Sequence, residues 1–400
     1  MRRKKRIFRH ILIWTLIFEI LFTNGVNIFI SDGFSNSNNT VRVYEVGDFV
    51  NSVAISYNGE YIVVGSDDNF VYLFNNTSNT PIWNYDTLGE VQKVSMSFNG
   101  DYITVGSDSG RVYLFEKTNS TPLWYYSPAQ GPVISDDGQY IITGGYLDDR
   151  IYFLNKTSNK PLWNYTTEST WPFGTLSSNG QYLVIGDYKN VSLFDKTNSI
   201  PLWSYETGDD VNDVAISSDG LYIVSASWSD NVYFFNRTSP NPLWTFSPEG
   251  NQRWVSISSD GRYIVAADFY NIYLFNSSNS NPLWSRSIEE FVRDVSISSD
   301  GQYIAVGTNG GEVYLFNNKN SIPIWSFSVG DYVRSLEISS NGQYITAGTA
   351  NKVYLIHRSY IPPPDYSLVW IIIISSISIG ALAVVIYLLY NVMHRRRVND

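Results

Sequence analysis

Nucleophilic catalysis needs an attacking side chain and an adjacent base, and this sequence has few residues that could fill these roles. The 400-residue chain has no cysteine. Its three histidines, His10, His357 and His394, lie outside the central repeats described below or at their very end. Carboxylates and lysines remain, but no local motif singles any of them out. We therefore expect no catalytic residue and no enzymatic activity.

Acidic turns are the remaining candidates for metal chemistry, because carboxylate oxygens bind Ca²⁺. Two such turns are SDDN (66–69) and YLDDR (146–150). Neither has the spacing of a calcium loop, so solvated turn residues are the simpler interpretation. The absence of cysteine also excludes thiolate ligands. The sequence predicts neither a metal site nor a cofactor.

The distribution of charge argues against another class of partner. The formal net charge of the chain is −10. Without the basic segment at residues 1–10, Glu19, the three arginines at 395–397 and Asp400, the middle of the chain has a net charge near −17. Nucleic-acid phosphates attract basic surfaces, so a nucleic-acid partner is not expected.

The two ends differ in character from the middle. Residues 1–30 combine a basic start with an apolar stretch, which predicts a signal peptide or an N-terminal membrane anchor. A linker follows at 31–40. Residues 366–390 carry no charge and are long enough to cross a bilayer, and a basic tail follows at 391–400. The positive-inside rule places both basic ends in the cytoplasm and the middle outside. We expect a protein of the cell membrane, with one span or with two if the N-terminal segment is retained.

The middle of the chain repeats about every 40 residues, which is typical of repeat architectures. Each repeat has four short runs rich in Val, Ile, Tyr, Phe and Trp; in the fifth repeat they lie at 211–217, 221–227, 231–236 and 242–246. An Asn-Gly or Asp-Gly pair between the first two runs predicts a hairpin turn. Four-stranded antiparallel units of this period predict β-propeller blades. The turn glycines are Gly59, Gly100, Gly138, Gly180, Gly220, Gly261, Gly301 and Gly342.

The count of repeats predicts how the ring closes. There are eight turn glycines but only seven fourth strands with the Pro-x-Trp pattern, and the last repeat ends after its third strand at 352–358. The unmatched segment 41–48 aligns with a fourth strand, so we expect it to complete the last blade. The prediction is an all-β, eight-bladed propeller of four-stranded antiparallel blades at 41–358, followed by a proline-rich linker at 359–365. The seven repeated tryptophans are expected to pack between blades.

One repeat carries a family resemblance. The stretch SSDGQYIAVGTNGGEVYLFN (298–317) resembles the WD40 repeat in its Ser-x-Asp-Gly turn, its Gly-Thr pair and its hydrophobic third strand. It departs from that pattern because Phe316-Asn317 stands where the family has Trp-Asp, and the Gly-His pair is absent. The stretch NKTSNKPLWNYTT (155–167) instead resembles the quinoprotein-type (PQQ-like) propeller repeat, in which a tryptophan ends a polar loop and docks between blades. Over 41–358 the resemblance implies a propeller fold and says little about function.

The connections between strands fall on two faces of the predicted ring. Loops joining first to second and third to fourth strands have nearly the same sequence in every repeat. Both predicted membrane tethers attach to the face that carries these loops. Loops joining second to third strands, and one repeat to the next, vary and point away from the membrane. Exposed aromatic residues and arginines are enriched at binding hot spots. The predicted ligand-face residues are Trp171, Trp228, Arg253, Trp254, Tyr270, Phe291 and Tyr332.

These features favour a membrane-tethered, extracytoplasmic scaffold without enzymatic activity, which binds a protein or a glycan on its membrane-distal face. One alternative is a quinone-dependent oxidoreductase, although the vicinal cysteines common in alcohol-oxidising quinoproteins are absent. Another is a structural component of the cell envelope or a signal-transmitting receptor. Asn-x-Ser/Thr sequons also make glycosylation a hypothesis, with candidate acceptors Asn38, Asn75, Asn119, Asn155, Asn236 and Asn276.

Overall fold

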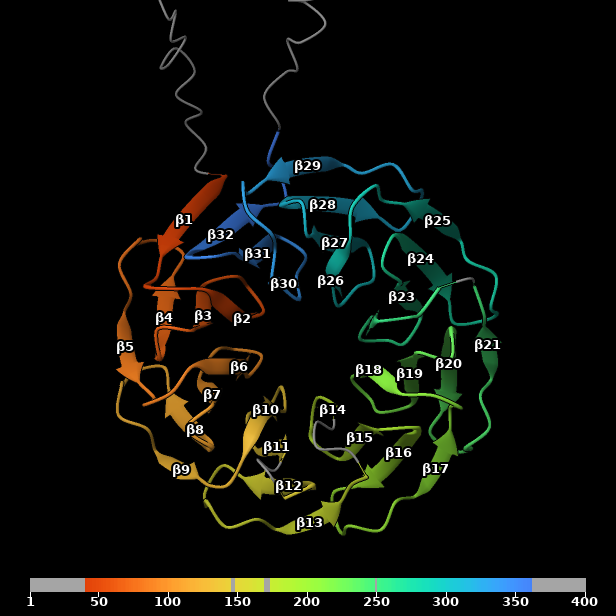
Figure 1. Cartoon of the computed structure of the whole chain (residues 1–400), viewed down its shortest axis with the longest axis horizontal. Helices are drawn as coiled ribbons and strands as arrows, with labels where there is room; N and C mark the ends of the chain where they lie inside the picture. The colour runs from red at the N-terminus through yellow and green to blue at the C-terminus, as the bar shows by residue number, and fades with distance from the viewer. Residues whose placement is uncertain (1–39, 145–147, 169–172, 249, 362–400) are drawn as a thin grey trace, which may run out of the picture. The chain divides into compact units, whose positions relative to one another are not determined.

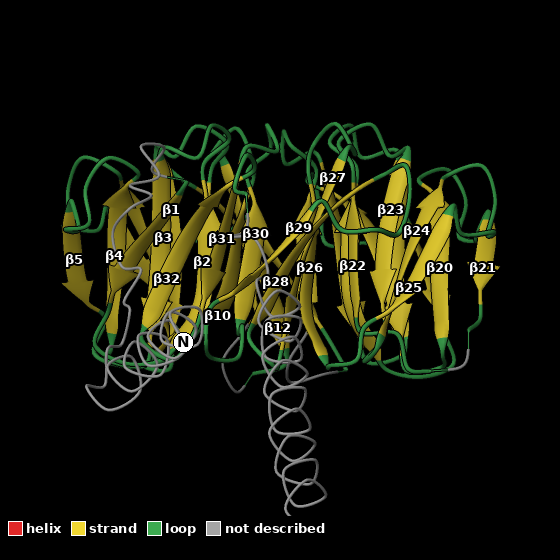
Figure 2. Cartoon of the chain, turned by 90° about the horizontal axis from the view of Figure 1, so that it is seen from above, coloured by secondary structure: helices red, strands yellow, loops and turns green. Residues whose placement is uncertain are grey.

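Eight blades form a ring (Figure 1) around a central channel lined by residues of the innermost strands. The computed structural model describes residues 40–144, 148–168, 173–248 and 250–361. Each blade is a four-stranded antiparallel sheet, and the strands run between two faces of loops (Figure 2). The predicted all-β, eight-bladed propeller is confirmed. The segments predicted as leader (1–30) and membrane span (366–390) lie outside the described residues, and no helix within the described part is long and apolar enough to cross a membrane.

Blades are numbered 1 to 8 along the chain, and each has an innermost strand at the channel and an outermost strand at the rim. The innermost strands are β2 (Val50–Ile55), β6 (Val91–Met96), β10 (Gln130–Ile134), β14 (Phe173–Leu176), β18 (Val211–Ile216), β22 (Trp254–Ile257), β26 (Val292–Ile297) and β30 (Ser335–Ile338). The second strands are β3 (Tyr61–Ser66), β7 (Tyr102–Ser107), β11 (Tyr140–Gly144), β15 (Tyr182–Asp187), β19 (Tyr222–Ser227), β23 (Tyr263–Ala267), β27 (Tyr303–Thr308) and β31 (Tyr344–Gly348).

The outer half of each blade contains the third and fourth strands. The third strands are β4 (Phe70–Asn75), β8 (Arg111–Glu116), β12 (Arg150–Asn155), β16 (Asn190–Asp195), β20 (Asn231–Asn236), β24 (Asn271–Asn276), β28 (Glu312–Asn317) and β32 (Lys352–His357). The outermost strands are β5 (Trp83–Asp86), β9 (Trp124–Tyr126), β13 (Trp163–Thr166), β17 (Trp203–Glu206), β21 (Trp244–Phe246), β25 (Trp284–Ser287), β29 (Trp325–Ser328) and, from the N-terminal end, β1 (Val41–Glu45).

The ring closes through β1, which is the outermost strand of blade 8. It pairs antiparallel with β32, from Val41 opposite Ile356 to Glu45 opposite Lys352. Tyr44 is fully buried in this strand, and its ring lies 4.6 Å from that of Phe74 in blade 1. The segment unmatched in the repeat count therefore joins the two ends of the propeller, as the sequence predicts.

The hydrophobic core lies between neighbouring blades. Second and third strands are covered on both sides, so their side chains form near-continuous buried runs, such as Ile62 to Val64 in β3. The repeated tryptophans pack there too, which confirms their predicted structural role. Trp83 donates its indole N–H to the carbonyl of Lys117 in the next blade at 2.8 Å. The same bond joins Trp124 to Lys156, Trp163 to Lys196, Trp203 to Arg237, Trp244 to Ser277 and Trp325 to Arg358.

The turn glycine of each blade contacts a tyrosine of the preceding blade. Gly59 has φ +73°, and a Cβ atom on it would lie 2.2 Å from Cδ2 of Tyr344 in blade 8. A Cβ atom on Gly100 would likewise contact the ring of Tyr61 in blade 1. The ammonium of Lys117 lies 4.6 Å from the centre of that tyrosine ring. Both the left-handed backbone and the crowding demand glycine at this position.

The loops define two faces, which we call the turn face and the variable face. The turn face carries the connections between first and second and between third and fourth strands. Both ends of the propeller lie there, because Val41 begins β1 opposite Ile356 near the end of β32. The sequon asparagines Asn75, Asn155, Asn236 and Asn276 end third strands at this face, Asn119 lies in the next loop, and Asn38 is outside the described residues. The variable face carries the remaining connections.

Candidate functional site

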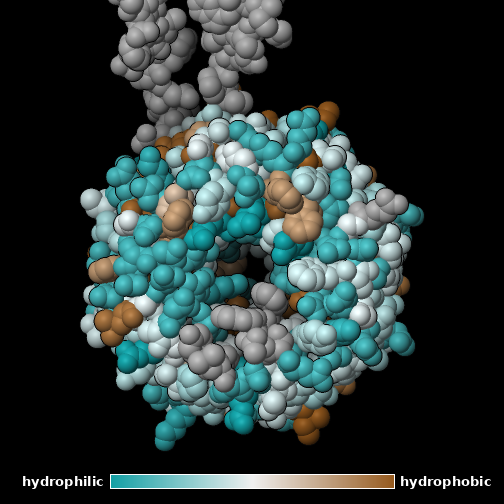
Figure 3. Space-filling view, viewed as in Figure 1, coloured by the Kyte–Doolittle hydropathy of each residue, from teal (hydrophilic) through white to brown (hydrophobic). Residues whose placement is uncertain are grey.

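The variable face surrounds the mouth of the channel, which opens at the centre of Figure 3. In six blades, one repeat position at the variable-face end of the innermost segment carries a polar residue. These residues, the mouth ring, are Asn51, Gln92, Asn212, Arg253, Arg293 and Arg334. In blades 1, 2, 5 and 7 the register of the innermost pair shifts at this residue. A bulge of this kind re-aims the extra side chain and is common beside functional sites.

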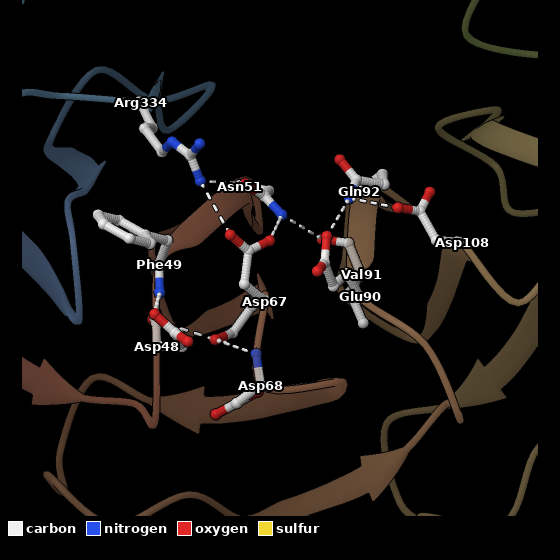
Figure 4. A network of polar contacts seen from close by, with 11 residues as sticks. Asp48, Phe49, Asn51, Asp67, Asp68, Glu90, Val91, Gln92, Asp108 and Arg334 are labelled. Carbon is white, nitrogen blue, oxygen red and sulfur yellow. Dashed lines mark hydrogen bonds and ion pairs between the residues drawn. The ribbon is translucent and has the colours of Figure 1, made fainter.

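Arg334 is held in a network that ties blade 8 to blade 1 (Figure 4). Its guanidinium donates to the side-chain oxygen of Asn51 and lies 3.3 Å from a carboxylate oxygen of Asp67. Asn51 in turn donates to Asp67 and to the carbonyl of Val91 in blade 2 at 3.1 Å. The guanidinium also lies 5.0 Å from the ring centre of Phe49. The guanidinium of Arg334 therefore has a hydrogen-bond partner, an ion-pair partner and a ring contact within the fold.

Arg253 lies against aromatic rings instead of carboxylates. Its guanidinium carbon is 4.7 Å from the ring centre of Phe269, 5.4 Å from that of Trp254 and 5.9 Å from that of Trp228. Burial and the neighbouring charge of Arg293 both lower the pKa of Arg253. An aromatic face attracts a guanidinium without neutralising its positive charge. A negatively charged partner could therefore add to the stabilisation of Arg253.

An aromatic patch extends this arginine site along blades 6 and 7. The ring of Phe269 contacts that of Phe291 edge-on at 5.4 Å, and Phe291 contacts Tyr270 at 4.7 Å. Trp228, Tyr270 and Phe291 are 42%, 44% and 43% exposed. Large apolar rings exposed at adjacent sites mark a surface suited to a partner.

Of the seven residues predicted for the ligand face, five gather in this patch: Trp228, Arg253, Trp254, Tyr270 and Phe291. Tyr332 lies apart, beside Phe49 and Arg334. The centre of its ring is 6.1 Å from the centre of the Phe49 ring. Trp171 is outside the described residues. Sequence reasoning missed Phe269, which links the two halves of the patch, and Arg293. A repeat alignment would have shown Arg293, because arginine occupies one repeat position in three successive blades.

The channel below the mouth is a cavity of about 850 Å³ with acidic walls. Asp213, Asp294 and Glu337 line it, with Lys93 as a cationic neighbour. Burial raises the pKa of Asp213 to about 6, that of Asp294 to about 7 and that of Glu337 to about 8. Each carboxylate accepts a backbone N–H of the next blade: Val255 on Asp213, Leu336 on Asp294 and Ile55 on Glu337.

The residues of the channel and of the acidic turns can be tested for their fit to a cofactor or a metal ion. A quinone of the kind bound by quinoproteins carries several carboxylates, which need cationic partners. Among the described residues that line the channel, Lys93 is the only cation, so the lining does not fit that group. The described residues contain no group of three or more His, Asp or Glu arranged to hold a metal ion. In the SDDN turn, Asp67 pairs with Arg334 and Asp68 accepts from the hydroxyl of Tyr72 at 2.6 Å, so both aspartates serve the fold.

The fold and the repeats define the class of protein, a repeat β-propeller, and comparison with known proteins specifies the family. Residues 127–326, half of the chain, match the family profile described as "Outer membrane protein assembly factor BamB". The chain belongs to that family. Residues 38–75 also match the WD-domain, G-beta repeat profile. A search of curated proteins found no match.

Solved structures with the same fold span most of this chain. The C-terminal WD40 domain of Sif2 is 16% identical, with a TM-score of 0.67, over 80% of this chain and 99% of that domain. BamB from Moraxella catarrhalis is 16% identical, with a TM-score of 0.61, over 79% and 100%. The computationally designed Ika8 protein is 12% identical, with a TM-score of 0.69, over 78% and 98%. At these identities the likeness concerns the fold alone.

Proposed function

We propose that this protein is a non-enzymatic interaction scaffold that binds a protein partner on its variable face. The observation that carries the proposal is the patch of Trp228, Arg253, Phe269, Tyr270 and Phe291, where aromatic rings and an arginine lie exposed or half-exposed on a rigid ring. Such side chains on a preformed scaffold bind with little loss of conformational freedom. Propellers of the WD40 and BamB types commonly mediate protein interactions, which supports the proposal.

The proposal extends to how the scaffold is held. An uncharged segment at 366–390 and basic residues at both ends support a tether in the cell membrane with the propeller outside. Both ends of the propeller lie on the turn face, so a tether there leaves the variable face free for a partner. Protease added to intact cells should then remove the propeller. Full protection, with the protein accessible after lysis, would contradict the outside location.

The binding proposal is tested by capture of a partner with the full chain. Trp228→Ala, Tyr270→Ala and Phe291→Ala, singly and together, should abolish recovery of partners seen with the wild type, while the melting temperature stays nearly constant because these side chains are half-exposed. Leu123→Ala, Leu162→Ala and Leu243→Ala are matched controls, since these residues are similarly exposed on the turn face. Recovery that fails in the controls and survives in the first set would assign binding to the opposite face.

A further inference from the structure

Two arginines of the mouth ring have no ion-pair or hydrogen-bond partner among the residues that the structure describes. Arg253 and Arg293 occupy the same repeat position in blades 6 and 7, and the charge of Arg293 is close enough to contribute to the lowered pKa of Arg253. Within the described residues, neither guanidinium forms a hydrogen bond or an ion pair. Arg334, at the same position in blade 8, is paired with Asp67 and Asn51.

Two carboxylates of the adjoining loops form hydrogen bonds within the fold and no ion pair with these arginines. Asp268 accepts from the backbone N–H of Tyr270 at 2.7 Å and from the side chain of Asn271 at 3.0 Å. Glu290 accepts from the hydroxyl of Thr308 at 2.8 Å. These bonds fix the loops on both sides of the arginines. The described part of the fold therefore supplies the rigid surroundings of the pair but no ion-pair partner for it.

The ring contacts hold Arg253 in place. Its guanidinium lies within 6 Å of the ring centres of Trp228, Trp254 and Phe269, so its planar donors are oriented before any partner arrives. A fixed guanidinium can donate two parallel hydrogen bonds to a carboxylate, which gives both strength and geometry. Arg293 is exposed and adds a second positive charge beside it.

We propose that Arg253 and Arg293 bind an aspartate or glutamate side chain in an acidic peptide segment of the partner protein, with an apolar side chain of the same segment packed on Tyr270 and Phe291. This inference rests on the proposed function and names the chemistry of its partner. A peptide fits better than a sugar, because Tyr270 and Phe291 lean on each other at 34° and Arg253 lies near the ring of Trp228. Stacking on a sugar would need open ring faces.

The test measures binding of a random copolymer of glutamate and tyrosine to the full chain in detergent, with a lysine–tyrosine copolymer and polygalacturonate as comparison probes. Wild type should prefer the glutamate–tyrosine polymer, and its affinity should fall as salt rises. The double variant R253Q/R293Q should bind about tenfold to a hundredfold more weakly, as expected for the loss of charged hydrogen bonds. R293Q alone should show part of the loss, and because Arg293 is exposed this variant should fold normally.

The matched control is Arg262→Gln, which removes an exposed arginine from the turn face, where Arg262 lies 3.8 Å from Asp260. Equal weakening in R262Q and R293Q, or a preference for the lysine–tyrosine polymer, would overturn the inference. Tighter binding of polygalacturonate would assign the arginines to an acidic glycan instead. Partner capture separates the two proposals: if the aromatic variants abolish capture and R253Q/R293Q does not, the inference fails while the proposed function stands.

Discussion

The backbone N–H of Ile55 donates to a carboxylate oxygen of Glu337 at 3.0 Å, across a sequence separation of 282 residues. Ile55 ends the innermost strand of blade 1, and Glu337 lies in the innermost strand of blade 8. The bond therefore crosses the seam where the ring closes. Similarly, the backbone N–H of Val53 donates to the hydroxyl of Ser335 and that of Val94 donates to the hydroxyl of Ser52, so such bonds connect adjacent innermost strands around the channel. Side chains of one blade thus satisfy the exposed N–H groups at the channel edge of the next.

The seam carboxylate should make stability depend on pH. Burial raises the pKa of Glu337 from 4.5 to about 8, so the folded state holds a proton that the unfolded state releases. Stability from this group is full below pH 4.5 and falls as pH rises toward about 8. Asp294 and Asp213, with pKa values raised to about 7 and about 6, act in the same direction.

Glu337→Gln should remove part of this dependence. At alkaline pH the glutamine oxygen still accepts from Ile55 without a buried charge. We expect the free energy of unfolding to rise by up to about 5 kcal/mol, given about 1.4 kcal/mol per pKa unit between 4.5 and about 8. Near pH 5 the variant and the wild type should match. Thermal or urea unfolding across this range measures the difference. A variant that is destabilised equally at both pH values would show that the carboxylate is not protonated in the fold.

Gly59→Ala should be strongly destabilising because its Cβ would meet Tyr344 at 2.2 Å and its φ is +73°. Gly131 is the matched control, since its φ is +64° and nothing lies within 4 Å of a Cβ there. We expect Gly131→Ala to cost about 1 kcal/mol from backbone strain alone. Gly59→Ala should cost a further 1–3 kcal/mol or so from overpacking. Equal losses in urea unfolding would mean that the tyrosine moves aside freely.

The indole bonds between blades can be measured with a matched pair of tryptophans. Trp203 and Trp284 are each 9% exposed, and their rings lie 5.4 Å and 5.6 Å from Phe235 and Phe316. Trp203 donates to Arg237 at 2.8 Å, whereas the indole N–H of Trp284 finds no acceptor among the described residues. Replacement by phenylalanine should therefore cost about 1 kcal/mol more at Trp203 than at Trp284. A reversed order in denaturant unfolding would contradict this.

Closure by β1 should contribute directly to stability. Tyr44 is fully buried, so Tyr44→Ala is expected to lower the free energy of unfolding by about 3–5 kcal/mol, the range for large buried rings. Tyr125 in β9 is 51% exposed, and Tyr125→Ala should change the free energy of unfolding by about 0.5 kcal/mol or less. Removal of residues 41–46 should destabilise the propeller further by exposing the edge of β32. A truncated chain with wild-type stability would refute a structural role for the closure.

The sequence by itself determined the ring. A repeat forces each residue type into the same environment in every blade, so Gly59 and its seven counterparts specify turns, and the tryptophans specify contacts between blades. The eighth outermost strand could also be found, because a missing repeat element at one end matched a spare segment at the other. Local periodicity and turn chemistry carry this information.

Only the tertiary structure decided which variable residues meet. Phe269 joins Arg253 to Phe291 because loops of adjacent blades converge at the channel, and no local pattern encodes that proximity. Arg334 pairs with Asp67, whereas Arg293 has no ion-pair partner among the described residues, because this depends on whether a neighbouring blade supplies a carboxylate. The acidic channel arises in the same way, since Asp213, Asp294 and Glu337 come from separate repeats and share an environment only when the ring is closed. Burial of their charges, which raises their pKa values, is a property of the closed ring and not of any repeat alone.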